Sequence, residues 1–269
     1  MAARKIWCGH EPMILKLTIH AGKEVPVKIV VADANQDYTM FTNRTENIVG
    51  QKDIFVRMPL SPWMAAINIY NVEIGNVSDE KDNSFHIVNI EKVPLEKKAD
   101  LADIDNAIIK SFVIFAQKFS YNAGVLPVGN YISTNRLFFI RYVDEIRGYV
   151  NANGQYVDDV VPTPFRISVD DGLIEADRKA VQLMTVPMRV ALLFHEFAHF
   201  WLNKEMNDEQ EADLNALYIY LGLGYPRLEA KDAFIETFEG NQTAANEERA
   251  ALINDFIDNF DNQKTIYRD

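Results

Sequence analysis

Residues 195–199 read His195-Glu196-Phe197-Ala198-His199. The functional interpretation of the C-terminal two-thirds of the chain depends on this stretch. Residues four apart on an α-helix lie on one face, so the two imidazoles can reach a single metal ion. Glu196 lies between them and can take a proton from a water molecule on that metal. The alternative is a pair of core histidines that are hydrogen-bonded to backbone groups.

The flanking residues predict that the pentapeptide lies in a buried helix. Thr185-Val186-Pro187 is typical of a helix start, because a proline near the first helical position lacks an N–H that would need a partner. Residues 188–202 are strongly apolar, which indicates that the helix is largely buried. Two histidines and a glutamate on such a helix need groups that satisfy them.

A third ligand has to come from elsewhere, since catalytic zinc usually has three protein ligands and an open position for water. No histidine follows His199, so the third ligand is expected to be a carboxylate. The candidates are Glu205, Glu209, Glu211 and Asp213.

A second helix is predicted to carry most of these carboxylates, over residues 208–221. Asn207 is expected as its N-cap, with Gln210 completing an arrangement like a capping box. Glu209 and Asp213 are four apart and share a face.

From this shared face, Glu209 is the preferred metal ligand, and Asp213 would accept the N–H of a ligand histidine. Glu211 is the alternative ligand. The acidic residues at the start of this helix could instead only complement the positive end of the helix dipole.

The segment Glu209-Gln210-Glu211-Ala212-Asp213 resembles the ExxAD segment that follows HExxH in gluzincin metallopeptidases. It is similar to the family that includes membrane-bound CAAX-prenyl peptidases, and it also resembles the phage- and plasmid-associated ImmA/IrrE-type peptidases. The resemblance covers about residues 187–226. It implies a zincin-type domain with Glu196 as the general base and Asp213 as the partner of a ligand histidine. The zinc ligands that it implies are His195, His199 and Glu209.

The composition is that of a globular protein, with 48% apolar and 25% charged residues in a chain of 269. A net charge of −12 disfavours partners such as nucleic acid or an anionic membrane surface. The single cysteine, Cys8, excludes an intramolecular disulfide and fits a reducing compartment. No signal peptide and no apolar run of about 20 residues are visible, so we expect a soluble, cytoplasmic protein.

Residues 1–97 are expected to form an all-β domain, a sandwich or a barrel, that serves as a docking or accessory module. None of its histidines has the spacing of metal ligands. The strands are predicted from short β-branched or alternating runs between Asn, Asp, Gly and Pro clusters, over residues 13–19, 25–31, 54–58, 66–74 and 85–93.

Residues 98–240 are expected to form the zincin-like α+β domain, and residues 241–269 a C-terminal helical tail. Besides the two helices of the site, helices are predicted over 103–121, 174–184, 228–238 and 244–260. Strands are predicted over 137–143, 148–150 and 165–169. The family resemblance implies that one edge strand binds an extended substrate, and residues 165–169 are the candidate.

These patterns predict a zinc-dependent metallopeptidase that acts on a protein or peptide substrate. A tyrosine or arginine is expected to help stabilise the oxyanion, and three tyrosines lie near in sequence: Tyr218, Tyr220 and Tyr225. The alternative is a structural or assembly protein, for instance a phage virion component, that carries the zinc domain as a scaffold. Its assembly partners would bind through the N-terminal β-domain.

Overall fold

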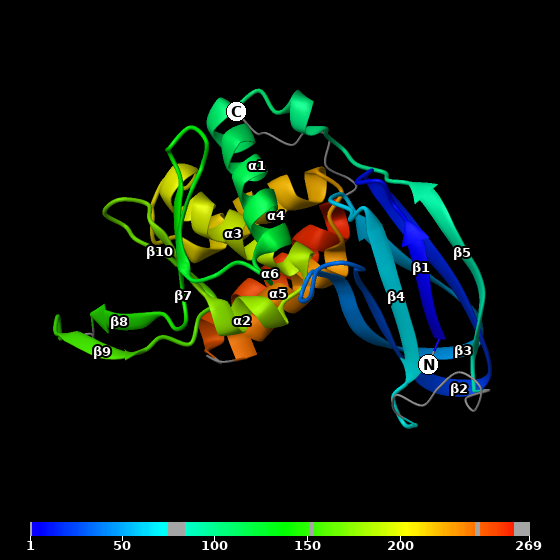
Figure 1. Cartoon of the computed structure of the whole chain (residues 1–269). Coiled ribbons are helices and arrows are strands. Elements are labelled where there is room, and N and C mark those ends of the chain that lie inside the picture. Colours follow the sequence, from blue (N-terminus) through cyan, green and yellow to red (C-terminus); the bar gives the residue numbers. More distant parts are fainter. Residues whose placement is uncertain (1, 75–83, 151–152, 240–242, 261–269) are drawn as a thin grey trace. The chain divides into compact units, whose positions relative to one another are not determined.

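The computed structural model describes residues 2–74, 84–150, 153–239 and 243–260 (Figure 1). The chain divides into two compact units. The first contains residues 1–96 with 224–226, and the second contains residues 97–223 with 227–269. A β-rich N-terminal region is followed by a region of mixed strands and helices, which confirms the predicted α+β class. Within the described ranges, no helix is both long and apolar enough to cross a membrane.

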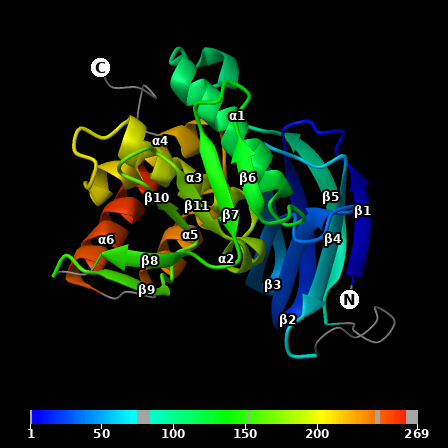
Figure 2. The ribbon, with the colours of Figure 1, turned by 60° about the vertical axis from the view of Figure 1, so that its left-hand side comes forward.

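The first unit is a five-stranded antiparallel sheet built around one long strand. Its strands are β1 Ala2–Trp7, β2 Met13–Asp33, β3 Met40–Met58, β4 Met64–Asn71 and β5 His86–Pro94. Along one edge β2 pairs with β3, and along the other its first half pairs with β5 and its second half with β4. The described strands thus form a single hydrogen-bonded sheet (Figure 2), where the sequence led us to expect a sandwich or a barrel.

The break predicted near residues 21–23 is a bulge inside β2. Ala21 lies opposite Gly50 of β3, whereas Val25 lies opposite Ile48, so β2 advances four residues while β3 advances two. Both steps are even, and the alternation of side chains between the two faces therefore continues through the bulge. The apolar side chains on both sides of the bulge point to the same core.

Most of β3 was not predicted, because it presents polar side chains to solvent. Only residues 54–58 have a recognisable apolar run, and between Thr42 and Ile48 exposed positions alternate with partly buried polar ones. The long pairing with β2 supplies the hydrogen bonds that this stretch needs as a strand. Strand β1 was also missed.

The second unit contains a four-stranded sheet, a two-stranded hairpin and the helices. Its sheet has the order β10-β11-β7-β6, in which β11 is parallel to β7 and the other pairs are antiparallel; β8 and β9 form the hairpin. The strands are β6 Gly129–Ile132, β7 Phe139–Val143, β8 Arg147–Val150, β9 Tyr156–Val160, β10 Phe165–Ile167 and β11 Ile174–Asp177. The helices are the 3-10 turn Leu101–Asp103, α1 Ala107–Asn122, α2 Arg178–Leu183, α3 Val186–Trp201, α4 Glu209–Gly222, α5 Arg227–Glu239 and α6 Ala244–Asn259.

Two helices begin at other residues than the sequence predicted. Residues 174–184 form strand β11 and then α2, because residues 174–177 pair with β7 and the Asp177 carboxylate accepts the N–H of Ala180 at the helix start. Helix α1 begins after Asn106, whose side chain accepts two backbone N–H groups of the first turn. The described part of the expected C-terminal tail is α6, which packs on α4 and α5 within the second unit.

Candidate metal centre

Helix α3 carries the pentapeptide and is buried along most of its length. It begins at the predicted start, with Thr185 as its N-cap, and the Thr185 hydroxyl accepts the N–H of Met188. The Phe197 ring stacks on Phe112 of α1 at a centroid distance of 4.1 Å. Because α1, α4, α5 and β10 all pack against α3, its side chains have fixed directions.

A buried arginine ties the first turn of α3 to the ends of two other helices. The guanidinium of Arg189 is fully buried and donates to the carbonyl oxygens of Ser120 in α1 and Val181 in α2, both at 2.8 Å. Burial lowers the pKa of Arg189 to about 10. The carbonyl groups near a helix C-terminus carry partial negative charge, so they are suitable partners for a cation.

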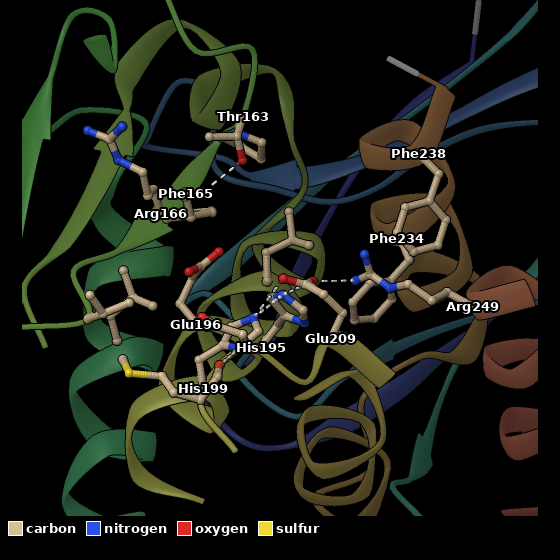
Figure 3. A pocket seen from close by; sticks show the side chains of 16 residues that line it. Thr163, Phe165, Arg166, His195, Glu196, His199, Glu209, Phe234, Phe238 and Arg249 are labelled. Carbon is tan, nitrogen blue, oxygen red and sulfur yellow. Dashed lines mark hydrogen bonds and ion pairs between the residues drawn. The ribbon is translucent and has the colours of Figure 1, made fainter. Parts of the chain in front are cut away.

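The predicted ligands converge at the end of the pocket (Figure 3). The Nε2 atoms of His195 and His199 lie 3.0 Å apart. The carboxylate of Glu209 reaches both rings, with Oε2 3.5 Å from His195 Nε2 and Oε1 3.6 Å from His199 Nε2. These three side chains form a cluster that could hold a metal ion.

The partners of the other ring nitrogens determine what the Nε2 atoms offer. His199 Nδ1 lies 2.7 Å from the carbonyl oxygen of Met206, which can only accept, so Nδ1 carries the hydrogen. His195 Nδ1 lies 2.9 Å from a carboxylate oxygen of Asp213, which also can only accept, so the ring hydrogen is assigned to this nitrogen. In the neutral rings both Nε2 atoms therefore present lone pairs to each other and to Glu209, an arrangement that needs a cation or an added proton between them.

The separations also suit an ion of the size of zinc. With zinc–ligand bonds of about 2.0–2.1 Å in a tetrahedral arrangement, ligand atoms lie roughly 3.3 Å from one another. The separations of 3.0, 3.5 and 3.6 Å in the cluster fall on both sides of this value. The donor set therefore fits a small divalent cation.

The charges around the cluster favour a cation within it. Burial by itself lowers the pKa of His195, but the contacts with Asp213 and Glu209 outweigh this and raise it to about 10. Burial and the charge on His195 lower the pKa of His199. For Glu209, burial is outweighed by His195 and Arg249, which lower the pKa to about 2. The acidic groups around His195 therefore favour a positive charge at this point.

Asp213 lies behind His195, as predicted, and a residue that the sequence did not point to completes its environment. Asp213 is fully buried and accepts hydrogen bonds from Arg249 of α6, with Nε 2.8 Å from Oδ2 and Nη2 3.0 Å from Oδ1. The same Nη2 lies 3.0 Å from Oε2 of Glu209. No motif links Arg249 to the pentapeptide, so only the fold could identify it.

Glu211, the alternative ligand, has a different role. Its carboxylate accepts the backbone N–H of Lys204 at 3.0 Å, outside the cluster. The N-cap of α4 is Asp208, which accepts the N–H of Glu211 at 2.9 Å, so the prediction of Asn207 as the cap was wrong by one residue. Glu205 is exposed and does not belong to the cluster.

Glu196 faces a pocket of about 280 Å³ that opens beside the cluster (Figure 3). Burial raises its pKa to about 7, against the lowering effects of His195 and of the Ile167 backbone N–H. Strand β10 forms one wall of the pocket, and apolar side chains form much of the remainder: Leu192, Phe234 and Phe238. The three tyrosines considered as oxyanion donors do not line it in the described part of the chain, whereas Arg166 and Arg249 do.

No protein-family model, curated protein or solved structure matches this chain.

Proposed function

We propose that this protein is a zinc-dependent metallopeptidase that hydrolyses peptide bonds. The observation that carries the proposal is the convergence of three lone-pair donors from His195, His199 and Glu209 next to a glutamate that faces a pocket. A zinc ion held by these residues would supply a Lewis acid that lowers the pKa of water and polarises a carbonyl group.

Glu196 is the proposed general base. Its carboxylate lies in the pocket wall one residue along α3 from His195 and points into the pocket. It takes a proton from the attacking water and delivers it to the leaving amine nitrogen.

Strand β10 is the proposed binding site for the substrate main chain. It is the terminal strand of the described four-stranded sheet, pairs with β11 along one edge, and lines the pocket. An extended peptide can add to such an edge through main-chain hydrogen bonds. The phenylalanines of α5 on the opposite wall, Phe234 and Phe238, favour an apolar side chain next to the cleaved bond.

We also propose that the protein is located in the cytoplasm. The single cysteine, Cys8, is buried and unpaired by a disulfide, which fits a reducing compartment.

The test is cleavage of a peptide library by the wild type and by Glu196→Gln. The variant should keep zinc and fold but lose at least about 10²-fold in rate, since general-base catalysis contributes about 10²–10⁴-fold. Glu205→Gln, an exposed position on the loop before α4, is the matched control and should cleave normally. If the wild type is as inert as Glu196→Gln across the library, the assembly role with the zinc domain as a scaffold is favoured instead.

A further inference from the structure

We propose that Arg249 is a positioning residue that fixes the geometry of the metal site by holding Glu209 and Asp213 together. The inference rests on the proposed zinc site. It makes α6, the last described helix, part of that site, although the helix supplies no ligand.

Arg249 contacts both the proposed ligand Glu209 and Asp213, the carboxylate behind His195. One edge of the guanidinium donates two hydrogen bonds to Asp213, which in turn contacts His195 Nδ1 at 2.9 Å. The shared Nη2 also contacts Oε2 of Glu209 at 3.0 Å. One rigid planar group therefore sets the distance between a ligand carboxylate and the carboxylate that orients a ligand histidine.

Asp213 needs this partner because it is fully buried. A buried carboxylate is costly unless its oxygens are paired, and His195 can satisfy only one of them. Without Arg249, Asp213 would keep an unpaired buried oxygen and would have to move toward water, which alters the orientation of the His195 ring.

Glu209 needs the contact with Arg249 for a different reason. Its side chain is 49% exposed and lies in the first turn of α4, where little packing restricts its rotamers. The contact with Arg249 holds one oxygen and directs the other toward His199, 3.6 Å from Nε2. Arg249 thereby reduces the rotational freedom that Glu209 would lose on binding a metal.

Arg249 is itself held in place. Its side chain is 13% exposed, and the guanidinium carbon lies 4.6 Å from the centre of the Phe238 ring. The cation–π contact and the two carboxylates leave it little freedom, so it can serve as a fixed support. A second link between α5 and α6, the ion pair Lys231–Asp258 at 3.0 Å, lies on the surface away from the pocket.

Position and charge predict opposite effects on metal affinity. As a positive charge near the cluster, Arg249 repels a cation, so its removal would strengthen metal binding if charge were its main effect. As a positioning residue, its removal weakens binding, typically by about 10–100-fold when a partner of a metal ligand is lost. The sign of the change therefore identifies the role.

The experiment compares zinc dissociation constants of the full-length wild type, Arg249→Met and Arg249→Lys by competition with a chromogenic chelator. Methionine preserves the packing on Phe238, and lysine preserves the charge but lacks the rigid planar fork that bonds both oxygens of Asp213 while it contacts Glu209. We expect about 10–100-fold weaker binding for Arg249→Met and a smaller loss for Arg249→Lys. The visible spectrum of cobalt-loaded protein, which reports the ligand set, should change in Arg249→Met.

Lys231→Met is the matched control, since it removes a link between the same two helices outside the pocket. It should leave both zinc affinity and the cobalt spectrum unchanged. Unchanged or stronger zinc binding in Arg249→Met and Arg249→Lys, with a normal wild type, overturns the role of Arg249 alone. A wild type that binds no zinc overturns the zinc site and this inference together. If Arg249→Met does not fold, Arg249→Lys decides: zinc affinity equal to wild type rejects the inference, and weaker affinity supports it.

Discussion

The Nε2 atoms of His195 and His199 lie 3.0 Å apart, while each Nδ1 atom faces an acceptor, Met206 or Asp213. Both rings are thus oriented by their second nitrogen, and their lone pairs are directed at the same point. A metal ion at this point would accept both lone pairs and relieve their mutual repulsion.

The first prediction is that zinc stabilises the folded protein. Because the cluster is assembled only in the folded state, zinc at a concentration 100 times its Kd should add about 2.7 kcal/mol to the free energy of unfolding. Thermal unfolding with zinc and with a chelator measures this. In His195→Ala the melting temperature should be the same in both conditions, and a zinc-dependent shift as large as that of the wild type would contradict the assignment.

The third ligand is tested on helix α4. Glu209→Ala should weaken zinc binding strongly because it removes a ligand, whereas Glu211→Ala removes only the contact with the Lys204 N–H. Equilibrium dialysis against zinc separates the two variants. The expected loss in Glu209→Ala is 10-fold or more, on the scale of about 10–100-fold known for partners of metal ligands. Equal retention in both variants would rule out Glu209.

The packing of α1 against α3 is the basis of another prediction. Phe112 is 1% exposed and stacks on Phe197, so Phe112→Ala should lower the free energy of unfolding by about 3–5 kcal/mol through lost burial and a new cavity. Ile114→Ala, on the same helix but 51% exposed, should change it by no more than about 0.5 kcal/mol. Urea unfolding compares them. A similar loss in both variants would contradict the described contact.

The free energy of unfolding is expected to depend on pH through Glu175 on β11. It lies opposite Arg166 of β10 and Arg141 of β7, and both guanidinium groups donate to its carboxylate. Burial raises the pKa of Glu175, but the hydrogen bonds from Arg166 and Arg141 outweigh this, so the pKa lies below its ordinary value of 4.5. A lowered folded-state pKa means that the stabilisation is complete above pH 4.5 and is lost as the pH falls below that value.

The matching experiment follows unfolding of wild type and Glu175→Gln from pH 7 to pH 3. We expect the variant to be less stable by about 2 kcal/mol at pH 7, with the difference shrinking toward pH 3. Asp170→Asn, an exposed position near β10, is the control and should follow the wild type at every pH. A difference that stays constant with pH would show that the charge of Glu175 is not what stabilises the sheet.

The local part of the site could be predicted because helix geometry alone determines it. The four-residue spacing of His195 and His199 and that of Glu209 and Asp213 each define a face, and the structure brings these two faces together. Glu211 lies about 200° around the helix from Glu209, at roughly 100° per residue, so it points away. Arg249 could not be predicted, since it reaches Asp213 from 36 residues away through packing of α6.

In the fold, too, features set by neighbouring residues could be predicted, whereas features set by distant strand pairing could not. Thr185 marked the start of α3 because capping is a local interaction. By contrast, residues 174–177 were predicted as the start of a helix but form a strand, because their backbone groups find partners in β7 and β10. The first part of β3 carries too few apolar side chains to be recognised, and its pairing with β2 across the sheet decides its structure.

Metal analysis of the native protein tests the central claim most directly. Inductively coupled plasma mass spectrometry of wild type and His199→Ala, each purified without added metal, should find about one zinc ion per wild-type chain and close to none in the variant. A folded wild type without zinc, or a His199→Ala variant with the same zinc content, would contradict the account.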